Sequence, residues 1–97
     1  LGHEFLRHVE RTRLLVHVVD LNADPVRAYR QVRAELEAYG RGLADKPEIV
    51  AANKIDVGGA AGALKDLRAA VDREIVPISG ATGEGLPELL KAILARL

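Results

Sequence analysis

Asn53-Lys54-Ile55-Asp56 is the stretch of this sequence most suited to binding a ligand. It follows a short apolar run and precedes two glycines. An aspartate carboxylate accepts two hydrogen bonds at once, and guanine offers a matching pair of donors, N1–H and N2–H₂, whereas adenine would present an acceptor. The type and position of Asp56 therefore predict a site that selects guanine.

The neighbours of Asp56 could support such a site. The Lys54 side chain has a methylene stem that can lie across a base while its ammonium stays in water, and the Asn53 amide can both donate and accept, tying its loop to others. A second stretch, Ser79-Gly80-Ala81, has small side chains that let backbone N–H groups approach a ligand. One of these donors could meet the guanine O6.

Both stretches also have a simpler interpretation. Asn, Asp, Ser and Gly are common in turns for local backbone reasons, and the segment 79–81 alone is typical of a turn ahead of a helix. Their occurrence together favours a base site. We expect Gly83-Glu84-Gly85 to be a turn into the last helix, Asp20 to be a loop hydrogen-bonder or N-cap, and His17 to be a packed, hydrogen-bonded core residue.

The elements that would position these residues alternate along the chain. Apolar runs rich in β-branched residues predict strands, and apolar spacing of three and four predicts helices. The strands are expected at 13–20, 48–52 and 74–78, and the helices at 25–39, 62–71 and 86–97, preceded by the tail of another helix within 3–12.

This alternation predicts an α/β fold with a parallel sheet, in which 13–20 is a buried central strand. Ligands of such folds bind at the carboxyl ends of the strands, where the loops containing Asp56 and Ser79 begin.

Composition excludes several classes of function. The 97 residues carry 14 basic and 14 acidic side chains and no cysteine, so there is no charge bias toward nucleic acid, no disulfide and no thiolate metal site. This is compatible with a reducing cytoplasm, and the apolar runs, of about five residues, are too short to cross a membrane. The chain lacks methionine, which suggests a piece of a longer protein.

Three separated signatures carry a family resemblance: "LGHEFLRH" at the start, "NKID" at 53–56, and "ISGATGEGL" at 78–86. In this order the chain resembles the C-terminal half of the G domain of Obg-family GTPases over essentially its whole length. The resemblance implies that Asn53, Lys54, Ile55 and Asp56 bind guanine and that Ser79, Gly80 and Ala81 make the second base contact. The family usually has alanine where this chain has Gly80.

The resemblance implies a three-layer parallel sheet of P-loop GTPase type, with residues 1–97 supplying only the C-terminal three βα units. The chain has no Gly-Lys dipeptide and so no P-loop. The P-loop, the switch regions and the Mg²⁺ ligands would lie upstream, and none of this chain's own residues is expected to bind Mg²⁺. A preceding strand would pair beside 13–20, whose edge is exposed without it.

By the same resemblance the intact parent would bind GTP and GDP and hydrolyse GTP with Mg²⁺ in the cytoplasm, in assembly of the large ribosomal subunit, contacting that subunit or its RNA. The fragment alone would be inactive. Two alternatives stay open: a non-catalytic module that docks on a ribosome or partner, and a different translation-factor-type GTPase. The sequence does not give the oligomeric state.

Overall fold

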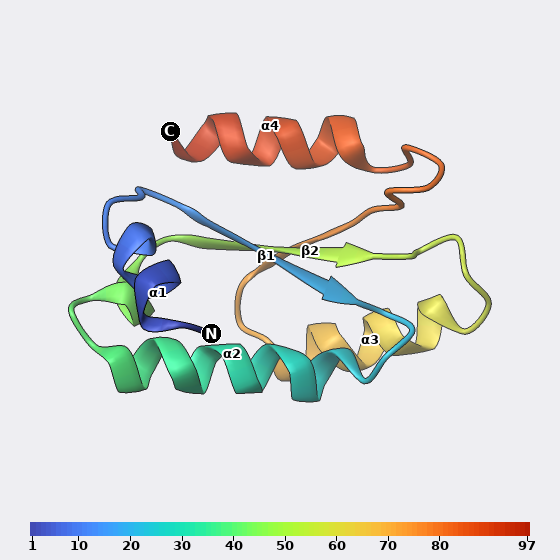
Figure 1. Ribbon diagram of the computed structural model, residues 1–97. Coiled ribbons are helices and arrows are strands. Elements are labelled where there is room, and N and C mark those ends of the chain that lie inside the picture. The colour runs from blue at the N-terminus through green and yellow to red at the C-terminus, as the bar shows by residue number, and fades with distance from the viewer.

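The computed structural model describes residues 1–97 and forms a three-stranded parallel sheet with helices on both faces (Figure 1). Its elements follow the predicted alternation. In chain order they are α1 His3–Val9, β1 Leu15–Asp20, α2 Pro25–Tyr39, the 3-10 turn η1 Leu43–Asp45, β2 Glu48–Asn53, α3 Ala60–Ala70, β3 Glu74–Pro77 and α4 Leu86–Arg96.

The strand order is β1-β2-β3, with all neighbours parallel. The register pairs Asp20 at the end of β1 with Asn53 at the end of β2, and Ala52 with Pro77 at the end of β3. The carboxyl ends of the three strands therefore meet at one edge of the sheet, as predicted, and the loops that follow them share that edge.

The central strand is β2, and the prediction that 13–20 is the central strand was wrong. The first five residues of β2 are all buried, whereas β1 lies at the edge with Val16 and Val18 39% and 59% exposed. An apolar run indicates burial but does not specify the order of strands. The exposed edge expected beside this strand is observed.

Two layers of apolar contacts hold the sheet between its helices (Figure 1). Alternate residues of β2 point to opposite faces. Val50 and Ala52 join a cluster with α2 and α3 that includes Tyr29 and Leu67, and Ile49 and Ala51 pack on the other face against residues of β3 and α4. This is the three-layer arrangement expected from the sequence.

A third cluster attaches α1 to the body of the fold. Leu6 of α1 packs with Leu36 of α2 and Leu43 of η1, all three buried. No helix of the chain is both long enough and apolar enough to cross a membrane.

Local signals place α2 at its predicted bounds, whereas α3 begins two residues early, at Ala60, and α3 and α4 each end one residue early, at Ala70 and Arg96. The Asp24 side chain accepts the Arg27 N–H at 3.3 Å and caps α2, and Gly40 ends that helix with a φ of 76°. Gly85 precedes α4 with a φ of 77°, which confirms that 83–85 turns into the last helix.

Gly85 also lies against the end of β3, which gives a first prediction. A Cβ at Gly85 would lie 2.1 Å from the Pro77 carbonyl oxygen, whereas a Cβ at Gly83, which has a φ of 86°, would meet nothing within 4 Å. We expect Gly83→Ala to lower the free energy of unfolding by about 1 kcal/mol through its backbone conformation alone, and Gly85→Ala by about 3 kcal/mol. Urea unfolding of the two variants measures the difference, and equal losses would contradict the close approach.

Candidate functional site

A single side-chain oxygen joins the two loops that the sequence singled out. Asn53 Oδ1 accepts the backbone N–H of Lys54 at 2.8 Å and the backbone N–H of Gly80 at 2.9 Å. The Ile55 N–H donates to the Ile78 carbonyl at 3.1 Å, which adds a second tie between the loops. The role predicted for Asn53, tying its loop to its neighbours, is confirmed.

The two residues that follow Lys54 behave differently. The Ile55 side chain is partly buried and packs against the cluster shared by the sheet, α2 and α3, so it anchors the loop to the core. Asp56 is exposed, and its carboxylate makes no hydrogen bond or ion pair within the chain. Its oxygens are therefore free to accept hydrogen bonds from a ligand.

Lys54 leaves β2 in an unusual backbone conformation. Its φ is 74°, a left-handed value that non-glycine residues seldom adopt. Its Nζ lies 2.8 Å from Asp20 Oδ2, across the carboxyl edge of the sheet. No local pattern in the sequence predicts this pair, because it depends on the register between β1 and β2.

Asp20 is held on both of its oxygens. Oδ1 accepts the Asn22 N–H at 2.8 Å, which confirms its predicted role as a loop hydrogen-bonder, and Oδ2 faces Lys54. The hydrogen bond from Lys54, followed by the one from Asn22, lowers the pKa of Asp20 below its ordinary value. The carboxylate is therefore fixed and negatively charged at neutral pH.

Ser79 is the buried centre of the second loop. It is fully buried, its N–H donates to the Glu84 carbonyl at 2.8 Å, its carbonyl accepts the Gly83 N–H at 2.8 Å, and its Oγ accepts the Thr82 N–H at 3.0 Å. These bonds shape the turn from within. The outer surface of the turn consists of Gly80 and Ala81, both exposed.

The two outer residues offer backbone donors. The Ala81 N–H has no partner within the chain, and the Gly80 N–H is bound to Asn53. A Cβ at Gly80 would lie 3.7 Å from Asn53 Oδ1, an ordinary contact, and Gly80 has no positive φ. The alanine usual in the resembling family would therefore fit here, and the glycine only gives the turn more conformational freedom.

Curated relatives match this chain along its length. It is 52% identical over 97 residues to the GTPase Obg of Picosynechococcus sp., 48% identical over 104 residues to that of Alkaliphilus oremlandii, and 50% identical over 101 residues to that of Crocosphaera subtropica. The alignments cover 96%, 100% and 100% of this chain. The chain matches an Obg-family GTPase region.

The match concerns part of each relative. The chain spans 27%, 24% and 30% of the lengths of the three Obg proteins named above. No protein-family profile matches the chain.

Metal ligands do not gather anywhere in this Obg-family region. No group of three or more His, Cys, Asp or Glu side chains converges in the structure. Mg²⁺ in nucleotide sites is usually held by one or two carboxylates or hydroxyls together with phosphates and water.

A buried charge that was not predicted from the sequence lies at the opposite edge of the sheet. Glu48, at the start of β2, has a fully buried side chain. Its Oε1 accepts the Tyr29 hydroxyl at 2.9 Å and lies 3.6 Å from Arg33 Nη1 and 3.5 Å from Arg73 Nε, and its Oε2 lies 3.2 Å from His17 Nδ1. One carboxylate thus joins β1, β2, α2 and the segment before β3.

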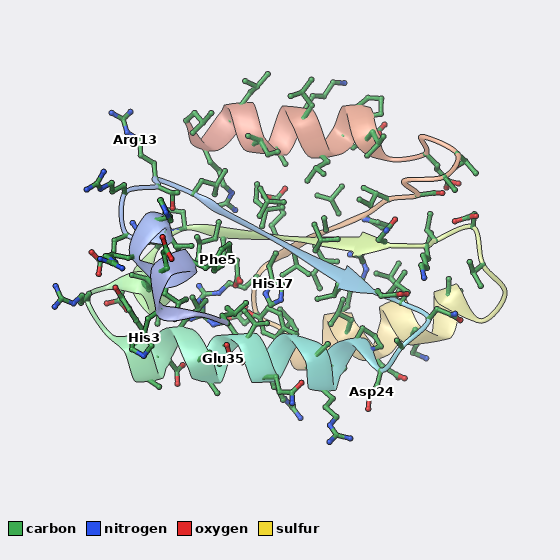
Figure 2. The ribbon with its side chains drawn as sticks, viewed as in Figure 1. His3, Phe5, Arg13, His17, Asp24 and Glu35 are labelled. Atoms are coloured by element: carbon green, nitrogen blue, oxygen red, sulfur yellow. The ribbon has the colours of Figure 1, made fainter.

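His17 occupies the position predicted for it. It lies between the sheet and α2 (Figure 2), its side chain is 10% exposed, and its ring stacks on Tyr29 with 5.0 Å between the centroids. A histidine buried in an apolar strand needs a hydrogen-bonding partner. His17 therefore indicated from the sequence that a polar side chain such as Glu48 lies beside it. The cluster lies at the amino ends of the strands, away from the two loops, so we interpret it as structural.

The surroundings of Glu48 keep it charged. Burial opposes ionisation, but the hydrogen bonds from His17 and Tyr29 and the charge of Arg33 outweigh it, so that the pKa of Glu48 lies below its ordinary value. A carboxyl whose pKa is lowered by folding contributes stability above its unfolded pKa, about 4.3, and loses that contribution as pH falls through its folded pKa.

Replacing this carboxylate should therefore change both the stability and its dependence on pH. We expect Glu48→Gln to lower the free energy of unfolding at pH 7 by about 3 kcal/mol, because Arg33 and Arg73 lose their counter-charge. The difference from the unsubstituted chain should shrink below about pH 4. Urea unfolding across pH measures it, with Glu37→Gln, an exposed change on α2, as the matched control. A constant difference at all pH values would contradict the role of the charge.

Proposed function

We propose that this chain is the guanine-recognition part of an Obg-type GTP-binding domain. The observation that carries the proposal is the junction at Asn53, whose amide oxygen holds the loop of Asp56 and the turn of Gly80 together. A base bound at this edge of the sheet would have donors and acceptors on two sides, which is what discrimination among bases requires.

Each part of the junction has a task in this proposal. The free Asp56 carboxylate accepts hydrogen bonds from guanine N1–H and N2–H₂, and the Ala81 N–H, which has no partner within the chain, donates to O6, while the Gly80 N–H stays bound to Asn53. Asn53 fixes the distance between the loops, Ile55 anchors the first loop to the core, Ser79 shapes the second, and the Lys54 stem offers a surface for the base to stack on.

We propose further that residues 1–97 are part of a larger G domain whose phosphate-binding half lies elsewhere in the parent chain. In support, β1 has an unpaired edge with exposed Val16 and Val18, and the outer side of α4 exposes Leu90 and Leu94, 56% and 61% accessible. Unpaired strand edges and contiguous apolar surfaces are normally covered in native proteins.

The activity proposed for the parent is hydrolysis of GTP by water to GDP and phosphate, assisted by Mg²⁺. The naming of the relatives as GTPase Obg supports this activity. A P-loop supplies backbone N–H groups, a lysine and a hydroxyl for phosphates and Mg²⁺, and this chain has no Gly-Lys dipeptide. From the family resemblance we extend the proposal to the cytoplasm and to assembly of the large ribosomal subunit, with that subunit or its RNA as partner.

Asp56 provides the direct test of base recognition. We expect Asp56→Asn in the full-length parent to weaken GTP binding about tenfold or more and to strengthen binding of xanthosine triphosphate, because the asparagine amide donates where the xanthine O2 accepts. Competition among GTP, xanthosine triphosphate and ATP against a fluorescent guanine nucleotide measures the change. Unchanged guanine preference in the variant would overturn the proposed site.

The division between base and phosphate recognition is tested by comparing the chain with its parent. We expect residues 1–97 alone to show no GTP turnover and to bind GTP about a hundredfold or more weakly than the parent, because charge-assisted contacts to phosphate and Mg²⁺ are missing. Phosphate-release assays and calorimetric titration measure both quantities. Turnover by the isolated chain would show that its own residues hold the phosphates.

A further inference from the structure

The Asp20–Lys54 pair is a contact that the proposed base site does not yet explain. Lys54 Nζ lies 2.8 Å from Asp20 Oδ2, and the two side chains are 45% and 40% exposed. Ion pairs with this much exposure add little to stability, because water and salt screen the charges and two long side chains lose freedom. The pair therefore contributes little to the stability of the fold.

The geometry suggests a different reason. The left-handed backbone of Lys54 and the hydrogen bond from its N–H to Asn53 set the direction in which its side chain leaves the loop. The contact with Asp20 fixes the other end, so the methylene stem extends from the end of β2 toward the end of β1. It therefore lies over the carboxyl edge of the sheet, where ligands of parallel α/β folds bind.

Asp20 is well suited to hold a flexible lysine. It is the last residue of β1 and pairs in register with Asn53, so its backbone is part of the sheet. Its second oxygen accepts the Asn22 N–H at 2.8 Å, which fixes the rotation of the carboxylate. The anchor is thus more rigid than the side chain that it holds.

We propose that Asp20 is a positioning residue of the base site, which holds the Lys54 stem extended so that a guanine base stacks on a surface that is already ordered. This inference rests on the proposed function. When a side chain with many rotamers is already ordered before the ligand arrives, binding does not pay the entropic cost of ordering it. Losing this prior order should therefore weaken affinity about two- to tenfold.

The test is a double-mutant cycle in the full-length parent, with GDP affinity measured by titration of a fluorescent GDP at fixed Mg²⁺ and salt. The variants are Asp20→Ala, Lys54→Ala and the double variant. We expect Asp20→Ala to weaken GDP binding about two- to tenfold in the presence of Lys54 and to have no further effect when Lys54 is alanine. Removing a negative charge near an anionic ligand would by itself favour binding, so a loss of affinity indicates position and not charge.

Two further variants separate positioning from simple disruption. Asp20→Asn keeps one acceptor oxygen in place of two, so it can serve either the Asn22 N–H or Lys54, and its GDP affinity should lie between those of the wild type and Asp20→Ala. Asp66→Ala removes an equal charge from the exposed surface of α3 and should leave GDP affinity unchanged. The melting temperature of the nucleotide-free protein should stay the same in Asp20→Ala, since the pair adds little stability.

The outcomes distinguish this inference from the function on which it rests. If Asp20→Ala leaves GDP affinity unchanged, or weakens it equally with and without Lys54, Asp20 does not position Lys54. If Asp56→Asn, measured alongside, switches preference to xanthine, the base site stands whatever the result at Asp20. If Asp56→Asn keeps its preference for guanine, the base site itself is wrong.

Discussion

The burial of the first five residues of β2 is the constraint on which the rest of this structure depends. A parallel strand covered on both faces has no solvent to satisfy its polar groups, so its backbone must pair with β1 and β3 and its ends must be finished by side chains. Glu48 does this at the amino end through His17, Tyr29 and two arginines, and Asn53 does it at the carboxyl end through two backbone N–H groups.

The polar side chains at the two ends of β2, Glu48 and Asn53, have different roles. At Glu48 a hydroxyl, an imidazole and two guanidinium groups face the carboxylate, which leaves little capacity for a ligand and stabilises one arrangement of four segments. At Asn53 the amide arranges its neighbours and leaves the Asp56 carboxylate and the Ala81 N–H without partners. The first arrangement is suited to holding the fold, and the second is suited to receiving a molecule.

Much of this architecture could be predicted from the sequence, because apolar periodicity and capping residues act locally. The helix from Pro25 to Tyr39 and the placing of the two loops at one edge followed from such signals. The edge position of β1 did not, because strand order depends on contacts between distant segments. His17 indicated that a polar partner was needed, but neither the identity of that partner, Glu48, nor the Asp20–Lys54 pair could be predicted, since each depends on register between strands and not on spacing along the chain.

The connection between the two loops has a consequence for how such domains diversify. Both loops joined by Asn53 lie within one continuous stretch, 53–81, and the contacts that shape them come mainly from β1, β2 and the turn itself. Most of the residues proposed to choose the base are therefore encoded by one short genetic segment, whereas Asp20, proposed to position Lys54, lies outside it. Under the proposed function, an exchange of this segment together with residue 20, by recombination or engineering, would change the nucleotide preference of a domain and leave its other parts unchanged.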